Sequence, residues 1–244
     1  MLIKSYKERQ LRIEDKKNLI LRYLRDETWS DGKNLSRLLG VTNTAIYKTL
    51  AMLERQGLLR SYSVPELKFK IWGITSMGLL YSWGEDEVME DRYSFESSKV
   101  KPVMIQHHLD LQLARFKAEA AGWKSWVPGN QLPKGLTKRP DAVSEAIGGK
   151  AKIAIELERT IKTKKRYEVI YSIYLQAIKR GEYNSIHYVC PDAGFAMRLK
   201  RMFALIKSVP VAGERVQINK KHRAKFPVYS LEQWPPANLE KEMG

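Results

Sequence analysis

The chain has 244 residues and a formal net charge of +16, with 43 Lys and Arg against 27 Asp and Glu. Such a balance favours a polyanionic partner, most often nucleic acid, because Lys and Arg replace the cations that condense on phosphates. No apolar run is long enough to span a bilayer, and the N-terminal stretch lacks the apolar core of a signal peptide, so we expect a cytoplasmic protein without membrane insertion.

The N-terminal third has a helical pattern followed by a hairpin pattern. Apolar residues recur at spacings of three and four over residues 13–27 and 43–56, which predicts two amphipathic helices. Between them a short helix over 33–39 ends at Gly40, which suits a left-handed C-cap. The other expected elements are strands at 58–63 and 69–75 and a closing helix at 76–83.

This order of elements is that of a winged helix-turn-helix, and the phrase LSRLLGVTNTAIYKTLAMLERQGLLRSY resembles the DNA-binding half of many winged-helix regulators. In such modules the N-terminal residues of the second motif helix enter the major groove. Asn can pair with adenine, whereas hydroxyls more often hold phosphates. A winged helix used only for protein contacts is the alternative. The resemblance implies DNA contacts by Thr42, Asn43, Thr44, Tyr47 and Lys48, and by Lys68 and Lys70 on the wing.

The middle of the chain predicts a linker and a long helix. Residues 84–98 read GEDEVMEDRYSFESS, an acidic run in a basic protein, so we expect domains at 1–83 and 101–244 joined by a linker at 84–100. An internal mimic of nucleic acid is the alternative for this run. A helix is expected over 103–121, where His107 and His108 diverge by about 100° and therefore serve packing or DNA contacts better than one metal ion. Its expected apolar stripe is Ile105, Leu109, Leu113, Phe116 and Ala120.

Carboxylates gather in the stretch 138–167, KRPDAVSEAIGGKAKIAIELERTIKTKKRY. On a strand ending at Glu158, the period of two places Glu156 and Glu158 on one face and Ile153, Ile155 and Leu157 on the other. Like charges so close are unfavourable unless a cation lies between them or one is protonated, which suggests metal or proton chemistry. Asp141, on the preceding strand, could reach the same pocket. A solvated acidic edge strand is the alternative.

The remaining sequence predicts an α/β sandwich with a mixed sheet. A basic helix is expected over 161–180, where a row of Val169, Ile173 and Ala177 continues back to Lys165 and favours Lys165 over Lys164 as the lysine that faces the sheet. A buried strand at 185–190 ends at Cys190, and a helix follows at 193–208. The single cysteine excludes a disulfide framework and is expected to be an inert core thiol.

The order Pro140-Asp141, Glu156-Leu157-Glu158 and a lysine-bearing helix resembles the PD-(D/E)xK nuclease superfamily, which includes restriction endonucleases. Glu158 stands where that superfamily usually has a lysine. Together with the winged helix, the pattern resembles the replication-relaxation family and plasmid relaxases of the MOBC class. The fold class this implies is a winged helix-turn-helix domain followed by a restriction-endonuclease-like α/β domain.

The resemblance implies metal-dependent, strand-specific nicking of double-stranded plasmid DNA at a transfer origin, with locally single-stranded DNA at the nick. Asp141 and Glu156 would bind Mg²⁺ or Mn²⁺, Glu158 would complete the metal shell or act as base, and Lys165 would stabilise developing charge. A coupling protein and other relaxosome components are implied as partners. A non-catalytic DNA-binding accessory or regulator and a restriction-type double-strand endonuclease remain open, as does attack by water or by a tyrosine such as Tyr167.

Overall fold

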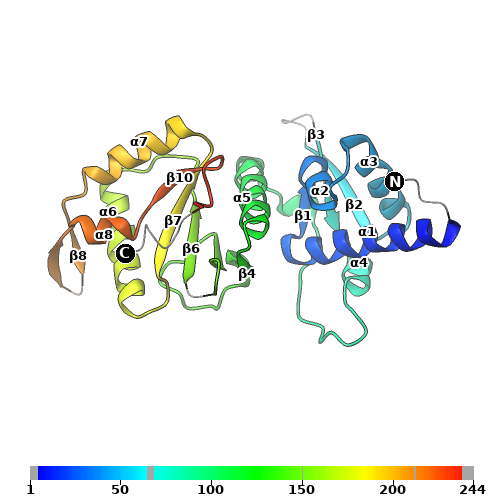
Figure 1. The fold of residues 1–244 in the computed structure, drawn as a ribbon, viewed down its shortest axis with the longest axis horizontal. Coiled ribbons are helices and arrows are strands. Elements are labelled where there is room, and N and C mark those ends of the chain that lie inside the picture. Colours follow the sequence, from blue (N-terminus) through cyan, green and yellow to red (C-terminus); the bar gives the residue numbers. More distant parts are fainter. Residues whose placement is uncertain (1–4, 65–68, 150, 212, 238–244) are drawn as a thin grey trace. The chain divides into compact units, whose positions relative to one another are not determined.

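The computed structural model describes residues 5–64, 69–149, 151–211 and 213–237, and the chain divides into two compact units, Met1–Leu109 and Asp110–Gly244 (Figure 1). The division lies inside helix α5 (Pro102–Ala120) and not in the expected linker at 84–100. The acidic run belongs to the first unit because Phe95 is buried in its core and Arg25 forms an ion pair with Glu87 at 2.8 Å. A Cβ atom at position 73 would lie only 1.9 Å from Cγ of Phe95, so Gly73 makes room for the Phe95 ring.

In the first unit, helices surround a three-stranded antiparallel sheet of order β1-β3-β2. Helix, strand, two helices and two strands is the element order of a winged helix-turn-helix, and it agrees with the order read from the sequence. The short strand β1 was not expected from the sequence. The elements are α1 (Tyr6–Glu27), β1 (Trp29–Asp31), α2 (Gly32–Leu39), α3 (Asn43–Arg55), β2 (Leu59–Val64), β3 (Phe69–Ile74), α4 (Ser76–Tyr81) and the 3₁₀ turn η1 (Ser97–Lys99).

Side-chain caps define where these helices begin. Helix α1 begins seven residues before the expected start because Ser5 and Glu8 form a reciprocal capping box, which the apolar pattern does not register. Asp31 caps α2 and Thr42 caps α3 through hydrogen bonds to backbone N–H groups. Gly40 ends α2 in the left-handed conformation, at φ 60°, so the expected C-cap is confirmed.

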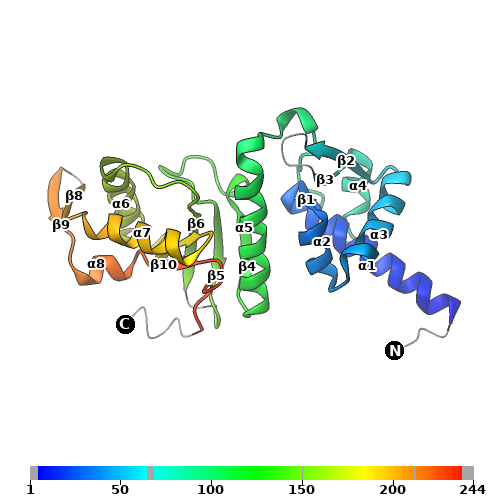
Figure 2. The ribbon, with the colours of Figure 1, turned by 90° about the horizontal axis from the view of Figure 1, so that it is seen from above.

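The second unit contains a mixed five-stranded sheet of order β10-β7-β6-β5-β4. Strands β4, β5 and β6 are antiparallel neighbours, whereas β7 runs parallel to β6 and β10 parallel to β7. Figures 1 and 2 show α6 and α7 over one face of this sheet and α5 over the other. The elements after α5 are β4 (Lys124–Pro128), the 3₁₀ turn η2 (Gly129–Gln131), β5 (Ala142–Glu145), β6 (Lys152–Leu157), α6 (Lys164–Lys179), β7 (Ser185–Cys190), α7 (Ala193–Ala204), β8 (Ser208–Val211), β9 (Glu214–Gln217), α8 (Lys220–Ala224) and β10 (Val228–Ser230).

Helix α5 does not bury the single apolar stripe expected from the sequence. Ile105 and Leu109 are buried in the core of the first unit, as expected. Beyond the division, however, the buried face is Leu111, Ala114 and Ala118, and Ala120 is exposed. The expected stripe is not observed because the first part of α5 packs in the core of the first unit and the later part packs in the core of the second unit. Among the described residues, no helix is both long and apolar enough to cross a bilayer.

Candidate functional site

The N-terminal half of α3 presents polar side chains to solvent. Ile46, Leu50 and Leu53 are fully buried, so the opposite face of the helix is left for contacts outside the unit. Lys48 forms no ion pair with another described residue, and neither does Lys70 at the start of β3. Lys68 lies outside the described residues. The exposed side chains on the N-terminal half of α3 and its cap are those of Thr42, Asn43, Thr44, Tyr47 and Lys48.

Three of these side chains are partly engaged inside the unit. The Thr42 hydroxyl accepts a hydrogen bond from the Ala45 backbone N–H at 3.3 Å, so its own proton is free to donate. The Asn43 side-chain oxygen accepts from the Ser36 hydroxyl at 3.0 Å, which leaves one lone pair and two N–H donors. Tyr47 is 51% exposed and its ring centroid lies 5.5 Å from that of Trp72. The surface is therefore preordered and rich in donors.

In the second unit, the expected carboxylates lie on or directly beside strands β5 and β6. Ile153, Ile155 and Leu157 pack in the core on the α5 side of the sheet, whereas Ala154 packs on the α6 side, so the expected alternation is confirmed. Glu156 shares the face of Ala154 and is buried. Asp141 directly precedes β5, and its backbone N–H donates to the Ile155 carbonyl at 3.0 Å.

Asp141 lies close enough to Glu156 to affect the ionisation of the Glu156 carboxyl. Burial raises the pKa of Glu156 above its ordinary value, and the nearby Asp141 carboxylate adds to the rise, while Lys138 opposes it. The Glu156 carboxylate accepts hydrogen bonds from the Lys138 ammonium and the Tyr174 hydroxyl. One oxygen of Asp141 accepts from the Leu157 backbone N–H at 2.8 Å. This is a compact carboxylate pair with a cation beside it.

Glu158 was expected to join this pair, but in the structure its carboxylate has other partners. It follows the end of β6, and its carboxylate accepts from the Lys162 ammonium and, at 3.0 Å, from the Tyr167 hydroxyl. Among the described residues no three acidic, His or Cys side chains form a group that could hold a metal ion. The three-carboxylate site with Asp141, Glu156 and Glu158 is therefore not formed, because Glu158 is held by partners of its own.

The lysine expected to face the site was misassigned. Lys165 is exposed, and Val169 in the same expected row is 48% exposed, so the half of that row nearest Lys165 faces solvent. The buried face of α6 is formed instead by Tyr167, Ile170, Tyr171, Tyr174 and Ala177. Lys164 forms an ion pair with Glu168 at 3.1 Å. The sequence argument failed because Tyr167, Tyr171 and Tyr174, which the aliphatic row left out, form much of the inward face of α6.

Sequence reasoning therefore missed Lys138 and Lys162, the two lysines that contact Glu156 and Glu158. Both lie in connecting segments, where no periodicity assigns a direction to a side chain. The only sequence signal was the spacing of four between Glu158 and Lys162, which matches an ion pair across one turn.

A buried tyrosine completes the surroundings of the glutamates. Glu156 and Glu158 both raise the pKa of Tyr188 on β7, after the larger effect of burial, so its ring lies near both carboxylates. Within the described part of the chain, the Tyr188 hydroxyl has no hydrogen-bond partner. An unsatisfied buried hydroxyl is costly, so its presence beside two carboxylates is an exception that calls for an explanation.

The other singled-out side chains have packing roles. The His108 ring lies 4.2 Å from that of Trp29 and its Nε2 lies 3.2 Å from the Trp29 carbonyl oxygen, so the packing interpretation is confirmed for it. Burial lowers the pKa of His108. Cys190 is fully buried, and burial raises the pKa of its thiol to about 12, which confirms an inert core thiol.

Comparison with known proteins yields little. No protein-family model matches this chain, and no curated protein matches it. Among solved structures, the apo form of the C30AH42A mutant of ZitR from Lactococcus lactis is similar, with 19% sequence identity and a TM-score of 0.26. The match covers 31% of this chain and 58% of the ZitR chain. The function considered below therefore follows from this chain's own residues.

Proposed function

We propose that this chain recognises double-stranded DNA with the winged helix of its first unit and nicks one strand with its second unit, as a plasmid mobilisation relaxase at a transfer origin. The observation that carries the proposal is the carboxylate pair of Glu156, on β6, and Asp141, which directly precedes the neighbouring strand β5 of the mixed sheet. Helix α5, the antiparallel strands β4 to β6, helix α6 and the parallel strand β7 follow in the order that the nuclease resemblance implies.

The residues present fit Mg²⁺ or Mn²⁺ bound by two protein carboxylates. Mg²⁺ in phosphoryl-transfer sites is commonly held by one or two carboxylates together with substrate phosphates and water, so a third acidic ligand is not required. Burial raises the pKa of Glu156 and the nearby Asp141 carboxylate adds to the rise, and a cation bound at both carboxylates would oppose these effects. A divalent cation there would polarise the scissile phosphate and activate the attacking group.

The lysines contribute charge at the same place. Lys138 contacts Glu156 and Lys162 contacts Glu158, so an ammonium group is positioned at each glutamate. A scissile phosphate at Asp141 and Glu156 would compete for the Lys138 ammonium and stabilise its own developing charge there. The Lys162 side chain is 39% exposed, so its ammonium group is accessible to DNA at the surface. It replaces Lys165 in the proposed mechanism.

In the first unit, α3 would read the major groove. Asn43 retains two donors and one acceptor for a base edge, whereas the hydroxyl of Thr42 and the ammonium of Lys48 suit backbone phosphates. Thr44 and Tyr47 extend the same surface, and Lys70 on β3 and Lys68, which lies outside the described residues, are the proposed phosphate contacts of the wing. These contacts supply the site specificity that a nickase needs.

The test uses supercoiled plasmid carrying the protein's own mobilisation region, incubated with full-length protein and Mg²⁺, Mn²⁺ or EDTA. We expect metal-dependent conversion to open circles, reduced at least ~100-fold by Asp141→Asn and by Glu156→Gln while footprints on the DNA stay unchanged. Lys162→Gln should reduce nicking about tenfold to 100-fold. Lys165→Gln, the matched control on the exposed face, should nick within about twofold of wild type. Full nicking by Asp141→Asn would eliminate the proposed site.

A second function is favoured by a specific observation, the ammonium group already bound to each glutamate. If Lys138 and Lys162 neutralise the glutamates permanently, the second unit is a binding scaffold and the chain is a DNA-binding accessory protein or regulator. That alternative predicts a full footprint with no cleavage under any metal. Linear product instead of open circles would indicate a double-strand endonuclease.

A further inference from the structure

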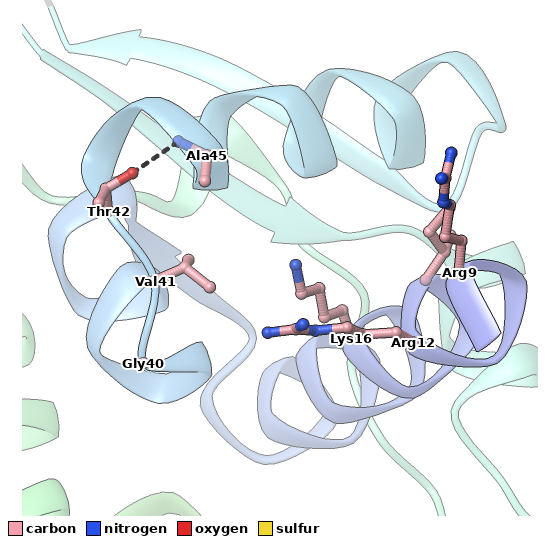
Figure 3. Close-up of a pocket in the computed structure, with 8 residues that line it drawn as sticks. Arg9, Arg12, Lys16, Gly40, Val41, Thr42 and Ala45 are labelled. Atoms are coloured by element: carbon pink, nitrogen blue, oxygen red, sulfur yellow. Dashed lines mark hydrogen bonds between the residues drawn. The ribbon is translucent and has the colours of Figure 1, made fainter. Parts of the chain in front are cut away.

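A basic groove runs between α1 and the start of α3. One hollow of 610 Å³ lies against the turn that joins α2 to α3, and its lining includes Arg9, Arg12 and Lys16 from α1. Figure 3 shows Arg12 and Lys16 reaching from α1 toward the segment Gly40 to Thr42. A second hollow of 190 Å³ shares Ile13 and Lys16 and adds Lys48 of α3. The two hollows together are called the α1–α3 groove.

The groove carries positive charge without internal compensation. Among the residues that the structure describes, no acidic side chain lines either hollow. Arg9, Arg12 and Lys16 form no ion pair with another residue in the described ranges, although α1 also carries acidic residues. Neighbouring cations repel one another, so their convergence is unfavourable unless an anion from outside the chain lies between them.

The positive side chains of α1 lie opposite the start of α3. Arg9, Arg12 and Lys16 follow one another at spacings of three and four, so they share a face of α1. The opposite wall begins at Gly40, where a Cβ would meet no atom within 4 Å, and continues through the Thr42 cap to Ala45. The positive end of the α3 dipole lies at this wall and adds to the attraction for an anion.

We propose that the α1–α3 groove binds the phosphodiester backbone of duplex DNA next to the bases contacted by α3. This rests on the proposed function of the first unit and adds a set of contacts that the helix-turn-helix residues do not provide. Phosphates are the matching ligand because several cations, two of them arginines whose guanidinium groups pair with phosphate oxygens, line an open surface beside the helix that would contact the bases. Such contacts fix position and affinity and carry no sequence information.

The test compares full-length wild type with a triple variant, Arg9→Gln, Arg12→Gln and Lys16→Gln. Binding to a duplex containing the footprinted site and to a scrambled duplex is measured by fluorescence anisotropy across a range of KCl concentrations. Each lost phosphate contact should reduce the slope of log affinity against log salt by about 0.9, so the triple variant should lose roughly 2 to 3. Affinity for both duplexes should fall by the same factor, about tenfold or more.

Two controls separate this proposal from its alternatives. Lys7→Gln removes an exposed cation from the same helix that does not line the groove, so its salt slope should equal that of wild type. Asn43→Ala should lower affinity for the site more than for the scrambled duplex. A triple variant with the wild-type slope would overturn the groove while leaving DNA recognition by α3 intact. Absence of any duplex binding by wild type would overturn both proposals.

Discussion

The lysines and arginines of the α1–α3 groove differ from those around Glu156 and Glu158 in what they face. Arg12 and Lys16 face an open hollow and have no acidic partner in the described part of the unit. Lys138 and Lys162 each contact a glutamate that is nearly or fully buried. The same residue type therefore has two different uses in one chain.

The difference determines what each group can do. An exposed cation without a partner keeps its hydration and contributes little to folding, but it remains available to a phosphate. A cation against a buried carboxylate compensates a charge that would otherwise be costly to bury, so removing either partner affects stability. We therefore expect substitutions in the groove to change binding, and substitutions at the glutamates to change stability and chemistry together.

The largest effect on stability is expected for Glu156→Ala. The substitution leaves the Lys138 ammonium and the Tyr174 hydroxyl without their shared acceptor in a buried environment. The free energy of unfolding should fall by about 3 kcal/mol, measured by urea denaturation followed by circular dichroism. The triple groove variant is the matched comparison, and its unfolding should stay within about 0.5 kcal/mol of wild type. Equal losses in the two variants would contradict the contrast between the two regions.

An effect that is intermediate in size within one to two pH units below 6.5, and grows at lower pH, is expected through His187 on β7. This side chain is fully buried, accepts a hydrogen bond from the Trp234 indole N–H at 3.1 Å, and has its pKa lowered by burial to about 3. Between pH 3 and the ordinary value of 6.5, the unfolded chain binds a proton that the folded chain does not. The stability that comes from burying the neutral His187 ring is therefore fully present above pH 6.5. The free energy of unfolding then decreases as the pH falls from 6.5 toward 3.

The expected slope for this one proton is about 1.4 kcal/mol per pH unit within that window. Unfolding free energies of wild type and His187→Asn, measured from pH 7 to 4, isolate the contribution. The Asn side chain retains an acceptor for Trp234 but does not titrate, so its curve should be flatter. Parallel curves would assign the acid sensitivity to other groups.

Much of the fold could be predicted from local sequence patterns. The winged-helix order was readable because caps, glycines and apolar spacing agree at each element, as at Thr42 and Gly40. The alternation of the two faces along β6 was readable because side chains on a strand point to opposite faces with a period of two. The division inside α5 was not, because a helix that serves two cores shows no break in composition.

The site was less predictable than the fold. Asp141 and Glu156 were identified because a strand assigns each residue to a face. The partners Lys138 and Lys162 lie in loops, whose path depends on contacts distant in sequence. Arg9 and Arg12 were overlooked because helix α1 was expected to begin after them, and the Ser5 capping box extends it.

The smallest effect is expected for Tyr188→Phe, and its sign is informative. The Tyr188 hydroxyl is buried beside Glu156 and Glu158 and lacks a partner among the residues described, so removing it should leave stability unchanged or raise it by about 1 kcal/mol. Tyr174→Phe is the matched control, since that hydroxyl donates to Glu156, and it should lower the unfolding free energy by about 1 kcal/mol. Both are measured by urea denaturation at one pH. If Tyr188→Phe loses as much stability as Tyr174→Phe, a bound water must satisfy the Tyr188 hydroxyl. The space between the two glutamates would then be hydrated, as a site that exchanges cations and phosphates requires.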